Sequence, residues 1–281
     1  MRRRNFMTVL AGAAAYPLLA GAQQKTMPVI GLLGAASPGP FAPYVTAFHQ
    51  GLSEAGYVER RNVAVEYRWA EGSYDRLPAL AADLVGRKVD VILASGGPAG
   101  ALGAKNATST IPIVFTGVGD PVGVGLVASF SRPGGNVTGM SFFDNELDLK
   151  RLELLSELVP HAGVIALLVN PNHPTSTVER KIREAQEAAR AKRVELHVLK
   201  ASTEGDFESA FASLLQAHAG ALAIGSDPLF NSRREELVAL AASYAVPAIY
   251  EWREFAAIGG LISYGPSLTG TWRQAGVYVG Q

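Results

Sequence analysis

Short apolar runs that alternate with helical patterns are the feature that most constrains the fold of this chain. Val29-Ile30-Gly31-Leu32-Leu33 is one continuous apolar run, and Val164–Val169 is a second of the same kind. Such runs are typical of strands that are buried on both faces, and the segments between them have the length and periodicity of helices. The sequence therefore predicts an α/β fold with doubly wound parallel sheets.

This pattern is completed once and then begins again. The first series of predicted strands ends at Val137–Ser141. We therefore expect an N-terminal lobe over residues 27–140 and a C-terminal lobe over residues 141–264. The last helical segment, residues 265–281, follows the second lobe and should return to the first. Because no linker rich in Gly, Pro or Ser separates the halves, we expect direct crossings that form a hinge.

Two local patterns predict details within the second lobe. Arg180 and Glu184 are spaced to pair on the exposed side of the helix predicted over residues 174–192. Ser232-x-x-Glu235 has the spacing of a capping box, which predicts that a helix begins there and runs to Ser243.

The first 22 residues have the three parts of a secretory signal. Arg2-Arg3-Arg4 give a basic start, residues 6–15 form a mildly apolar stretch, and Ala20-Gly21-Ala22 offers small residues for a signal peptidase. The apolar stretch is too short to remain in a bilayer as an anchor. Arg3-Arg4 fits the twin-arginine export route, and an ordinary signal with a chance arginine run is the alternative. We expect export by one of these routes.

The absence of cysteine limits both the compartments and the kinds of site that this chain can have. It excludes disulfides, thiolate metal sites, a cysteine nucleophile and a lipid-anchored cysteine. An exported protein without a lipid anchor stays near the inner membrane only where an outer membrane retains it, so we expect the periplasm. The chain has 25 basic and 25 acidic residues, and this balance gives no electrostatic reason to expect binding to nucleic acid.

The loops that follow the predicted strands are the predicted ligand site. Ligands of open parallel sheets bind beyond the carboxyl ends of the strands, and here those ends carry small and polar residues in both halves of the chain. Gly96 and Gly97 would let a ligand approach backbone N–H groups at a helix start, which favours a carboxylate. These residue types also make ordinary turns and caps, so the hypothesis rests on the repetition of polar loops at the same end of both halves.

Charged and aromatic residues near these loops indicate what a ligand would carry. Asp120 and Asp227 are candidates to receive an ammonium group. Large aromatic side chains would cover an aromatic or apolar body. The aromatic candidates are Tyr44, Phe230, Tyr250 and Trp252.

Patterns for catalysis, cofactors and metals are missing from the sequence. Gly117-x-Gly119 follows a predicted strand, but the next glycine, Gly123, comes one residue late for a dinucleotide loop. None of the five histidines has metal-ligand spacing or stands beside a GxSxG serine, and we expect most of them at the surface or at helix ends. We therefore expect a protein without cofactor or metal that is not an enzyme.

Several longer motifs resemble a known family. The most recognisable is Pro133-Gly134-Gly135-Asn136-Val137-Thr138-Gly139. In the order of the chain, these motifs resemble the ABC transporter substrate-binding family that includes tryptophan- and tyrosine-type binding proteins, from about Pro28 to the end. The accompanying motifs are Asp120-Pro121-Val122-Gly123, Asn170-Pro171, Ser226-Asp227-Pro228 and Ser263-Tyr264-Gly265.

This resemblance implies a type I periplasmic-binding-protein fold, in which two lobes close on a ligand and the closed form docks on a permease. The first loop is rich in Ala, Pro and Gly and departs from the aromatic-amino-acid members, so the resemblance does not fix the ligand. Members usually continue beyond the helix at residues 272–279, which predicts an incomplete cover with exposed apolar surface here. The positions that match the family's ligand-binding loops best are Ser37, Ser95, Thr116, Asp120, Asn170, Asp227 and Tyr250.

We therefore expect an exported monomer that binds a small molecule, such as an aromatic amino acid or a related compound. It would deliver this ligand to the permease and ATPase of an ABC importer. The alternatives are a periplasmic sensing module for a membrane receptor and an enzyme on a doubly wound fold.

Overall fold

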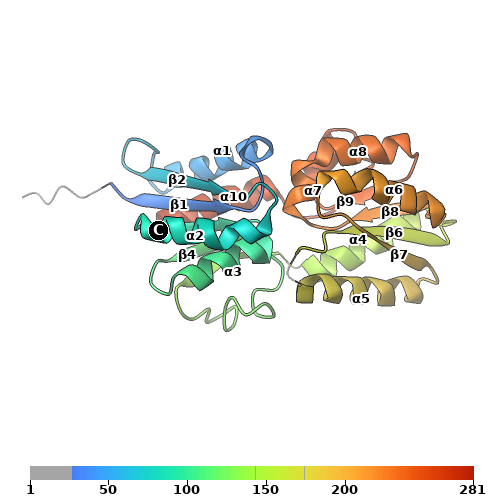
Figure 1. Ribbon diagram of the computed structural model, residues 1–281, viewed down its shortest axis with the longest axis horizontal. Coiled ribbons are helices and arrows are strands. Elements are labelled where there is room, and N and C mark those ends of the chain that lie inside the picture. Colours follow the sequence, from blue (N-terminus) through green and yellow to red (C-terminus); the bar gives the residue numbers. More distant parts are fainter. Residues whose placement is uncertain (1–26, 143, 174) are drawn as a thin grey trace, which may run out of the picture.

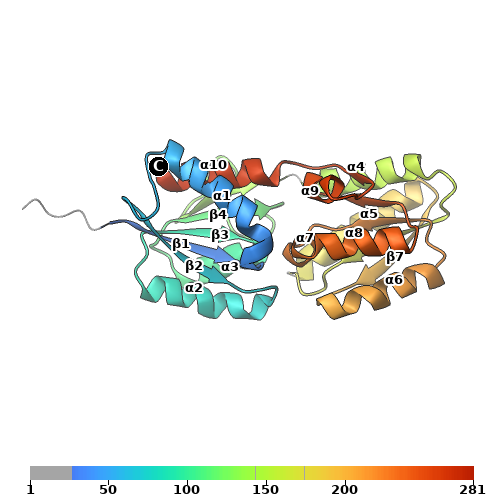
Figure 2. The ribbon, with the colours of Figure 1, turned by 90° about the horizontal axis from the view of Figure 1, so that it is seen from above.

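The strands form two separate parallel sheets in the computed structural model, which describes residues 27–142, 144–173 and 175–281. The first sheet contains β1 (Val29–Gly34), β2 (Ala64–Trp69), β3 (Val91–Ser95), β4 (Ile113–Val118) and β5 (Val137–Ser141). The second contains β6 (Val164–Val169), β7 (Glu195–Lys200), β8 (Ala221–Ile224), β9 (Ala248–Tyr250) and β10 (Ile262–Ser263). Their orders are β2-β1-β3-β4-β5 and β10-β9-β8-β6-β7, and neighbouring strands run parallel. Figures 1 and 2 show the sheets as two lobes that lie end to end.

Helices cover both faces of each sheet. The first lobe carries α1 (Pro38–Glu54), α2 (Leu77–Gly86), α3 (Gly97–Ala107) and α10 (Leu268–Gly280). The second carries α4 (Asp144–Leu158), α5 (Thr175–Ala191), α6 (Phe207–Gln216), α7 (Pro228–Ser232), α8 (Arg234–Ser243) and α9 (Arg253–Ala257). Successive residues of β1 point to opposite faces of the sheet. Leu32 packs against the layer of α1 and α10, and Leu33 packs against the layer of α2 and α3. The prediction of doubly wound parallel sheets in two lobes is confirmed.

The last helix, α10, packs on α1 of the first lobe although β10 of the second lobe precedes it (Figure 2). Two glycines let the helices approach closely. A Cβ atom on Gly51 would clash with the carbonyl oxygen of Arg273, and one on Gly276 would clash with that of Phe48. The approach buries Trp272 almost completely. The chain therefore passes between the lobes twice, once after β5 and once before α10.

The capping box predicted at Ser232 and Glu235 is wrong. The Ser232 hydroxyl donates to the carbonyl oxygen of Pro228 inside the short helix α7. Helix α8 begins at Arg234, and its N-cap Arg233 forms no capping hydrogen bond through its side chain. Serine and glutamate at this spacing are common within helical segments, and the pattern alone does not distinguish a helix start from a turn between two helices.

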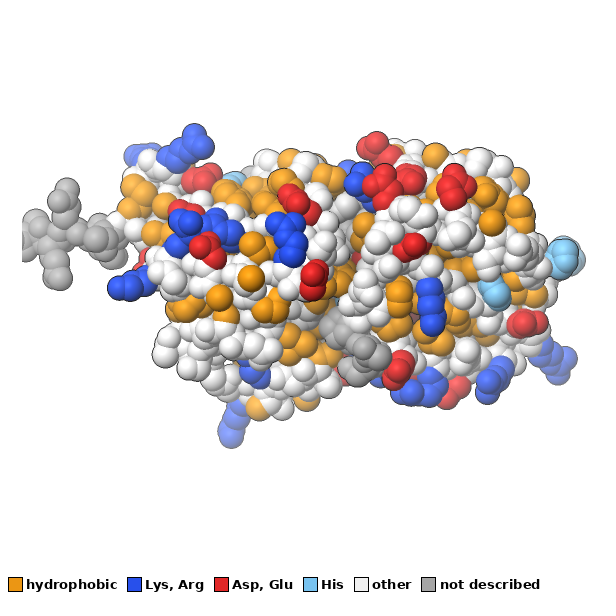
Figure 3. Space-filling view, viewed as in Figure 1, with side chains coloured by type: hydrophobic (Ala, Val, Ile, Leu, Met, Phe, Trp, Pro, Cys, Tyr) orange, Lys and Arg blue, Asp and Glu red, His pale blue; other side chains and the backbone are white. Residues whose placement is uncertain are grey.

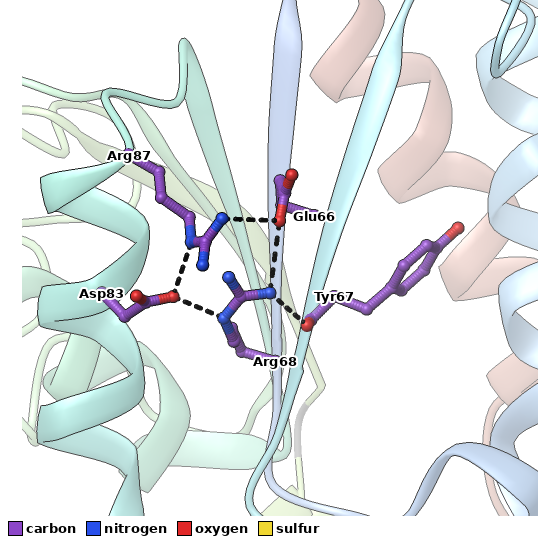
Figure 4. Close-up of polar contacts among 5 residues, drawn as sticks. All are labelled: Glu66, Tyr67, Arg68, Asp83 and Arg87. Atoms are coloured by element: carbon purple, nitrogen blue, oxygen red, sulfur yellow. Dashed lines mark hydrogen bonds and ion pairs between the residues drawn. The ribbon is translucent and has the colours of Figure 1, made fainter.

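A ring of four charged side chains ties the edge strand β2 to α2 (Figure 4). Arg68 Nε and Arg87 Nε both donate to Asp83 Oδ2, at 2.6 and 2.9 Å, and both arginines lie near Glu66 Oε2, at 3.3 and 3.7 Å. Glu66 and Arg68 share one side of the strand, whereas Tyr67 points to the other. Exposed ion pairs contribute little stability individually. Charges on an edge strand do hinder its pairing with another chain.

The surface carries charges of both signs over both lobes on the face shown in Figure 3. None of the helices in the described part of the chain has the length and hydropathy needed to cross a bilayer. A partly apolar groove lies beside the end of α10, where Val29, Leu52, Val91 and Val279 contribute to its lining. The incomplete cover of this lobe stays a prediction. Residues 1–22, the predicted export signal, lie outside the described residues.

Replacing Gly51 by Ala should force α1 and α10 apart, because the new methyl group meets backbone rather than a movable side chain. We expect the free energy of unfolding, measured with urea, to fall by about 1–3 kcal/mol. Gly39→Ala is the matched control, since a Cβ atom there has open space, and it should leave stability unchanged or raise it by up to about 1 kcal/mol. Equal midpoints for the two variants would contradict the packing of α10 on α1.

Candidate functional site

A cleft lies between the two lobes, at the carboxyl ends of the parallel strands. Its unfilled space is about 720 Å³, counting the part that opens to solvent. Both lobes and the returning helix α10 contribute to the lining. The lining includes Phe41, Gly96, Gly97, Thr116, Asp120, Phe142, His173, Arg180, Lys181, Asp227, Asn231, Trp252, Leu268 and Trp272.

The turn between β3 and α3 brings backbone to the cleft. Gly96 and Gly97 have φ values of 102° and 73°, in the left-handed region that side chains disfavour. A Cβ atom on Gly96 would clash with Ala35, and one on Gly97 would lie 3.3 Å from Nε2 of His173 in the second lobe. Glycine at both positions therefore allows the start of α3 to face the opposite lobe at close range.

Aromatic side chains form the apolar walls of the cleft. Phe41 of α1 and Trp272 of α10 pack edge to face with ring centroids 5.9 Å apart. Phe142, which follows β5, packs edge to face with Trp252, which follows β9, at 5.5 Å. The first pair belongs to the first lobe with its returning helix, and the second pair belongs to residues 141–264. Walls of this kind suit a flat aromatic or apolar body.

The carboxylate of Asp227 is the most fully satisfied polar group in the cleft. Oδ1 accepts from Asn170 Nδ2 at 3.2 Å and from the Leu229 N–H at 2.8 Å. Oδ2 accepts from the Tyr74 hydroxyl at 2.8 Å and lies 2.8 Å from His173 Nδ1, which must carry a proton to donate to a carboxylate. Burial and the charge of Asp227 raise the pKa of Tyr74 well above its ordinary value. Tyr74 therefore stays a donor, and it comes from the first lobe.

A second polar contact joins the lobes at Asp120. Arg180 Nη1 of α5 donates to Asp120 Oδ2 at 2.6 Å, and the Gly123 N–H donates to Asp120 Oδ1 at 2.7 Å. The Gly123 N–H and Arg180 hold the pKa of Asp120 below its ordinary value against the opposing effect of burial. The prediction that Arg180 stays on the exposed side of its helix is wrong. It lines the cleft, and Glu184 is the more distant partner, at 4.0 Å.

Five of the ten residues proposed from the sequence line this cleft: Gly96, Gly97, Thr116, Asp120 and Asp227. Asn170 lies behind it and holds Asp227. We expected Asp120 and Asp227 to receive an ammonium group. In the structure, both carboxylates already accept hydrogen bonds from protein donors.

The other four residues proposed from the sequence are outside the lining. Tyr44 is buried, and its hydroxyl lies 3.5 Å from Asn231 Oδ1; burial raises its pKa to about 12, so it remains a donor. Tyr250 is buried and stacks on Phe255 at 4.7 Å. Ser95 is buried at the end of β3, and Ser37 is the N-cap residue of α1.

Among the aromatic candidates, Trp252 lines the cleft, whereas Phe230 is buried beside Phe207 in the core of the second lobe.

The structure brings several residues to the cleft that were not proposed from the sequence. His173 was expected, like most of the histidines, at the surface or at a helix end; it lies between β6 and α5 and lines the cleft, and its position four residues after a predicted strand is the signal that could have identified it. Asn231 lies one helical turn after Asp227, which is the signal that could have identified it. Lys181 follows Arg180 and pairs with Asp148 at 3.1 Å. Within the described ranges, no three His, Asp or Glu side chains gather as metal ligands would.

Comparisons with known proteins agree with this architecture. A tyrosine-binding protein of Clostridioides difficile strain R20291 is 33% identical over 168 residues, which are 60% of this chain and 47% of that protein. The match thus spans about half the length of that relative. A conserved domain protein of Vibrio cholerae is 24% identical, with a TM-score of 0.80, over 90% of this chain and 83% of that one. An ABC domain of Streptococcus pneumoniae in complex with L-Trp is 21% identical, with a TM-score of 0.78 and the same coverage.

The two solved structures have low identity to this chain and show that the fold is shared. The family model described as ABC transporter substrate binding protein matches residues 41–281, which is most of the sequence. The chain therefore belongs to the ABC transporter substrate-binding protein family.

Proposed function

We propose that this protein is the solute-binding component of an ABC importer, which binds a small molecule between its lobes and delivers it to the permease. The observation that carries the proposal is the cleft, which both lobes line and which has aromatic walls at Phe41, Trp272, Phe142 and Trp252. The relatives named above include one called tyrosine-binding and one in complex with L-Trp. An aromatic body is accordingly the ligand feature that the cleft supports best.

The protein would act by binding and release, without a chemical step. In this proposal residues 27–140 and 265–281 move as one lobe and residues 141–264 as the other. A ligand that touches both lobes favours the closed arrangement by the free energy of the contacts it adds on closure. We further propose that the chain is exported to the periplasm through a signal in residues 1–22, by the twin-arginine or the ordinary route, and works there as a monomer.

A thermal-shift screen tests the proposal directly. Aromatic acids, amino acids, sugars and purines are added to the purified protein, and a true ligand raises its stability by about 2.7 kcal/mol at a hundred times its Kd. Trp252→Ala should weaken the best ligand about tenfold or more, since it removes one aromatic wall. Phe130→Ala, at an exposed phenylalanine, is the control and should bind as the wild type does. Consumption of the ligand, or no ligand in any class, would argue against the proposal.

Asp227→Asn should destabilise the protein, because an amide places a donor where Tyr74 or His173 needs an acceptor. We expect the free energy of unfolding in urea at neutral pH to fall by about 1–3 kcal/mol. Asp75→Asn makes the same chemical change at an exposed position and should cost less than about 0.5 kcal/mol. A variant at residue 227 as stable as the wild type would show that the four donors do not depend on this carboxylate.

The lowered pKa of Asp120 predicts a defined acid sensitivity. Stability from a carboxyl group with a depressed folded-state pKa is present above its ordinary value of 3.8 and disappears as the pH falls through the depressed value. Below about pH 4, the free energy of unfolding of the wild type should therefore fall more steeply with pH than that of Asp120→Asn. Urea midpoints between neutral pH and that region measure both slopes, with Asp75→Asn as a control that should follow the wild type. Parallel curves for all three proteins would refute the role of Asp120.

A further inference from the structure

We propose that the cleft selects an aromatic or apolar acid, recognised through its anionic group, over the corresponding amino acid with an ammonium group. This inference rests on the proposed binding function and narrows its ligand class. It follows from an asymmetry among the residues that line the cleft: the two carboxylates, Asp120 and Asp227, have protein donors, whereas the buried NH₂ group of Asn231 has no acceptor.

The acidic side chains that line the cleft are Asp120 and Asp227. Each oxygen of Asp227 has two donors within 3.2 Å, which is about the number that a carboxylate oxygen accepts. Both oxygens of Asp120 also have a protein donor, and one of these donors is the positively charged Arg180. A ligand ammonium could reach a carboxylate only by displacing Tyr74, His173 or Arg180, and displacing Arg180 would leave two cations in one site.

The free donor lies at Asn231. Asn231 lines the cleft, only 2% of its surface is exposed, and its Nδ2 has no hydrogen-bond partner among the described residues. Its Oδ1 is already oriented by the Tyr44 hydroxyl, at 3.5 Å, which leaves the NH₂ group as the side that needs a partner. Arg180 Nε has no hydrogen bond, but it lies 4.0 Å from Oε1 of Glu184, which is not among the lining residues. A ligand oxygen is the partner that the NH₂ group of Asn231 lacks, and a carboxylate also brings a charge that suits Arg180.

The charges around these donors also favour an anion. Arg180 and Lys181 are consecutive on α5 and both line the cleft, whereas Asp148, the partner of Lys181, is not among the lining residues. The glycine turn at residues 96–97 adds the start of α3, whose N–H groups favour negative charge. The aromatic walls then remain for the uncharged part of the molecule. An ammonium group would meet Arg180 and Lys181, and the two lining carboxylates already have protein donors.

Matched pairs of probes test the proposal. We would measure Kd by titration calorimetry at neutral pH for 3-phenylpropionate against L-phenylalanine and for indole-3-propionate against L-tryptophan. Each pair differs by the ammonium group alone. We expect the acid to bind at least about tenfold more tightly in the pair that fits. Equal or tighter binding of the amino acid would overturn the inference and leave the proposed function intact.

Two further outcomes separate this inference from the proposed function. If neither pair binds and a compound of another class does, the inference is wrong and the binding function stands. If no compound from the wider screen binds, both fail.

Variants of Asn231 locate the donor. Asn231→Asp replaces the NH₂ group by a negatively charged oxygen and should weaken the acid at least about tenfold while weakening the amino acid less. Asn106→Asp, at an exposed position on α3, makes the same change away from the cleft and should have no effect on Kd. Should Asn231→Asp fail to fold, as judged by circular dichroism, Asn231→Ala removes the donor without adding charge and should weaken the acid about fivefold. Affinities equal to the wild type in the folded variant would show that Asn231 does not bind the ligand.

Discussion

The contact between the two lobes depends on the buried carboxylate of Asp227. A charge removed from water is tolerated only where hydrogen bonds replace those of the solvent, and here four donors do so. Asn170, Leu229 and His173 belong to the same lobe as Asp227, but Tyr74 belongs to the other. Full satisfaction of the carboxylate without water therefore exists only while the lobes are together. If the lobes separated, water would take the place of Tyr74 at this carboxylate.

The sequence was sufficient to predict the fold because its evidence is local. The strand β6 was predicted with the bounds that it has, since Val164–Val169 is entirely apolar and is followed by Asn170 and a proline. The alternation of such runs with helices determines how the sheets are covered, whatever the details of side-chain packing. The capping box predicted at Ser232 was wrong because two residues give little information. The same spacing also occurs where one short helix ends and the next begins, as α7 and α8 do here.

The sequence predicted which loops form the candidate site but not which of their side chains line it. The rule that ligands bind at the carboxyl ends of parallel strands led to the correct loops, but it does not say which way a side chain points. Tyr250 and Trp252 are two residues apart in one loop; the first stacks on Phe255 in the interior, and the second lines the cleft. Arg180 finds its partner Asp120 in the opposite lobe, and Trp272 reaches the cleft through a helix that returns from far along the chain. No pattern within a single segment carries that information.

The return of α10 to the first lobe also limits how the two halves can move. Two lobes joined by a single connecting segment can twist and bend about that segment in any direction. When a second connecting segment lies near the first, the line through both segments becomes the favoured rotation axis, and other relative motions are resisted. In the proposed closing motion, the two connections would favour rotation about this one axis and so bring the cleft edges together in a similar register. Donors and aromatic walls contributed by different lobes can then meet a bound molecule with reproducible geometry, although neither lobe contains the whole site.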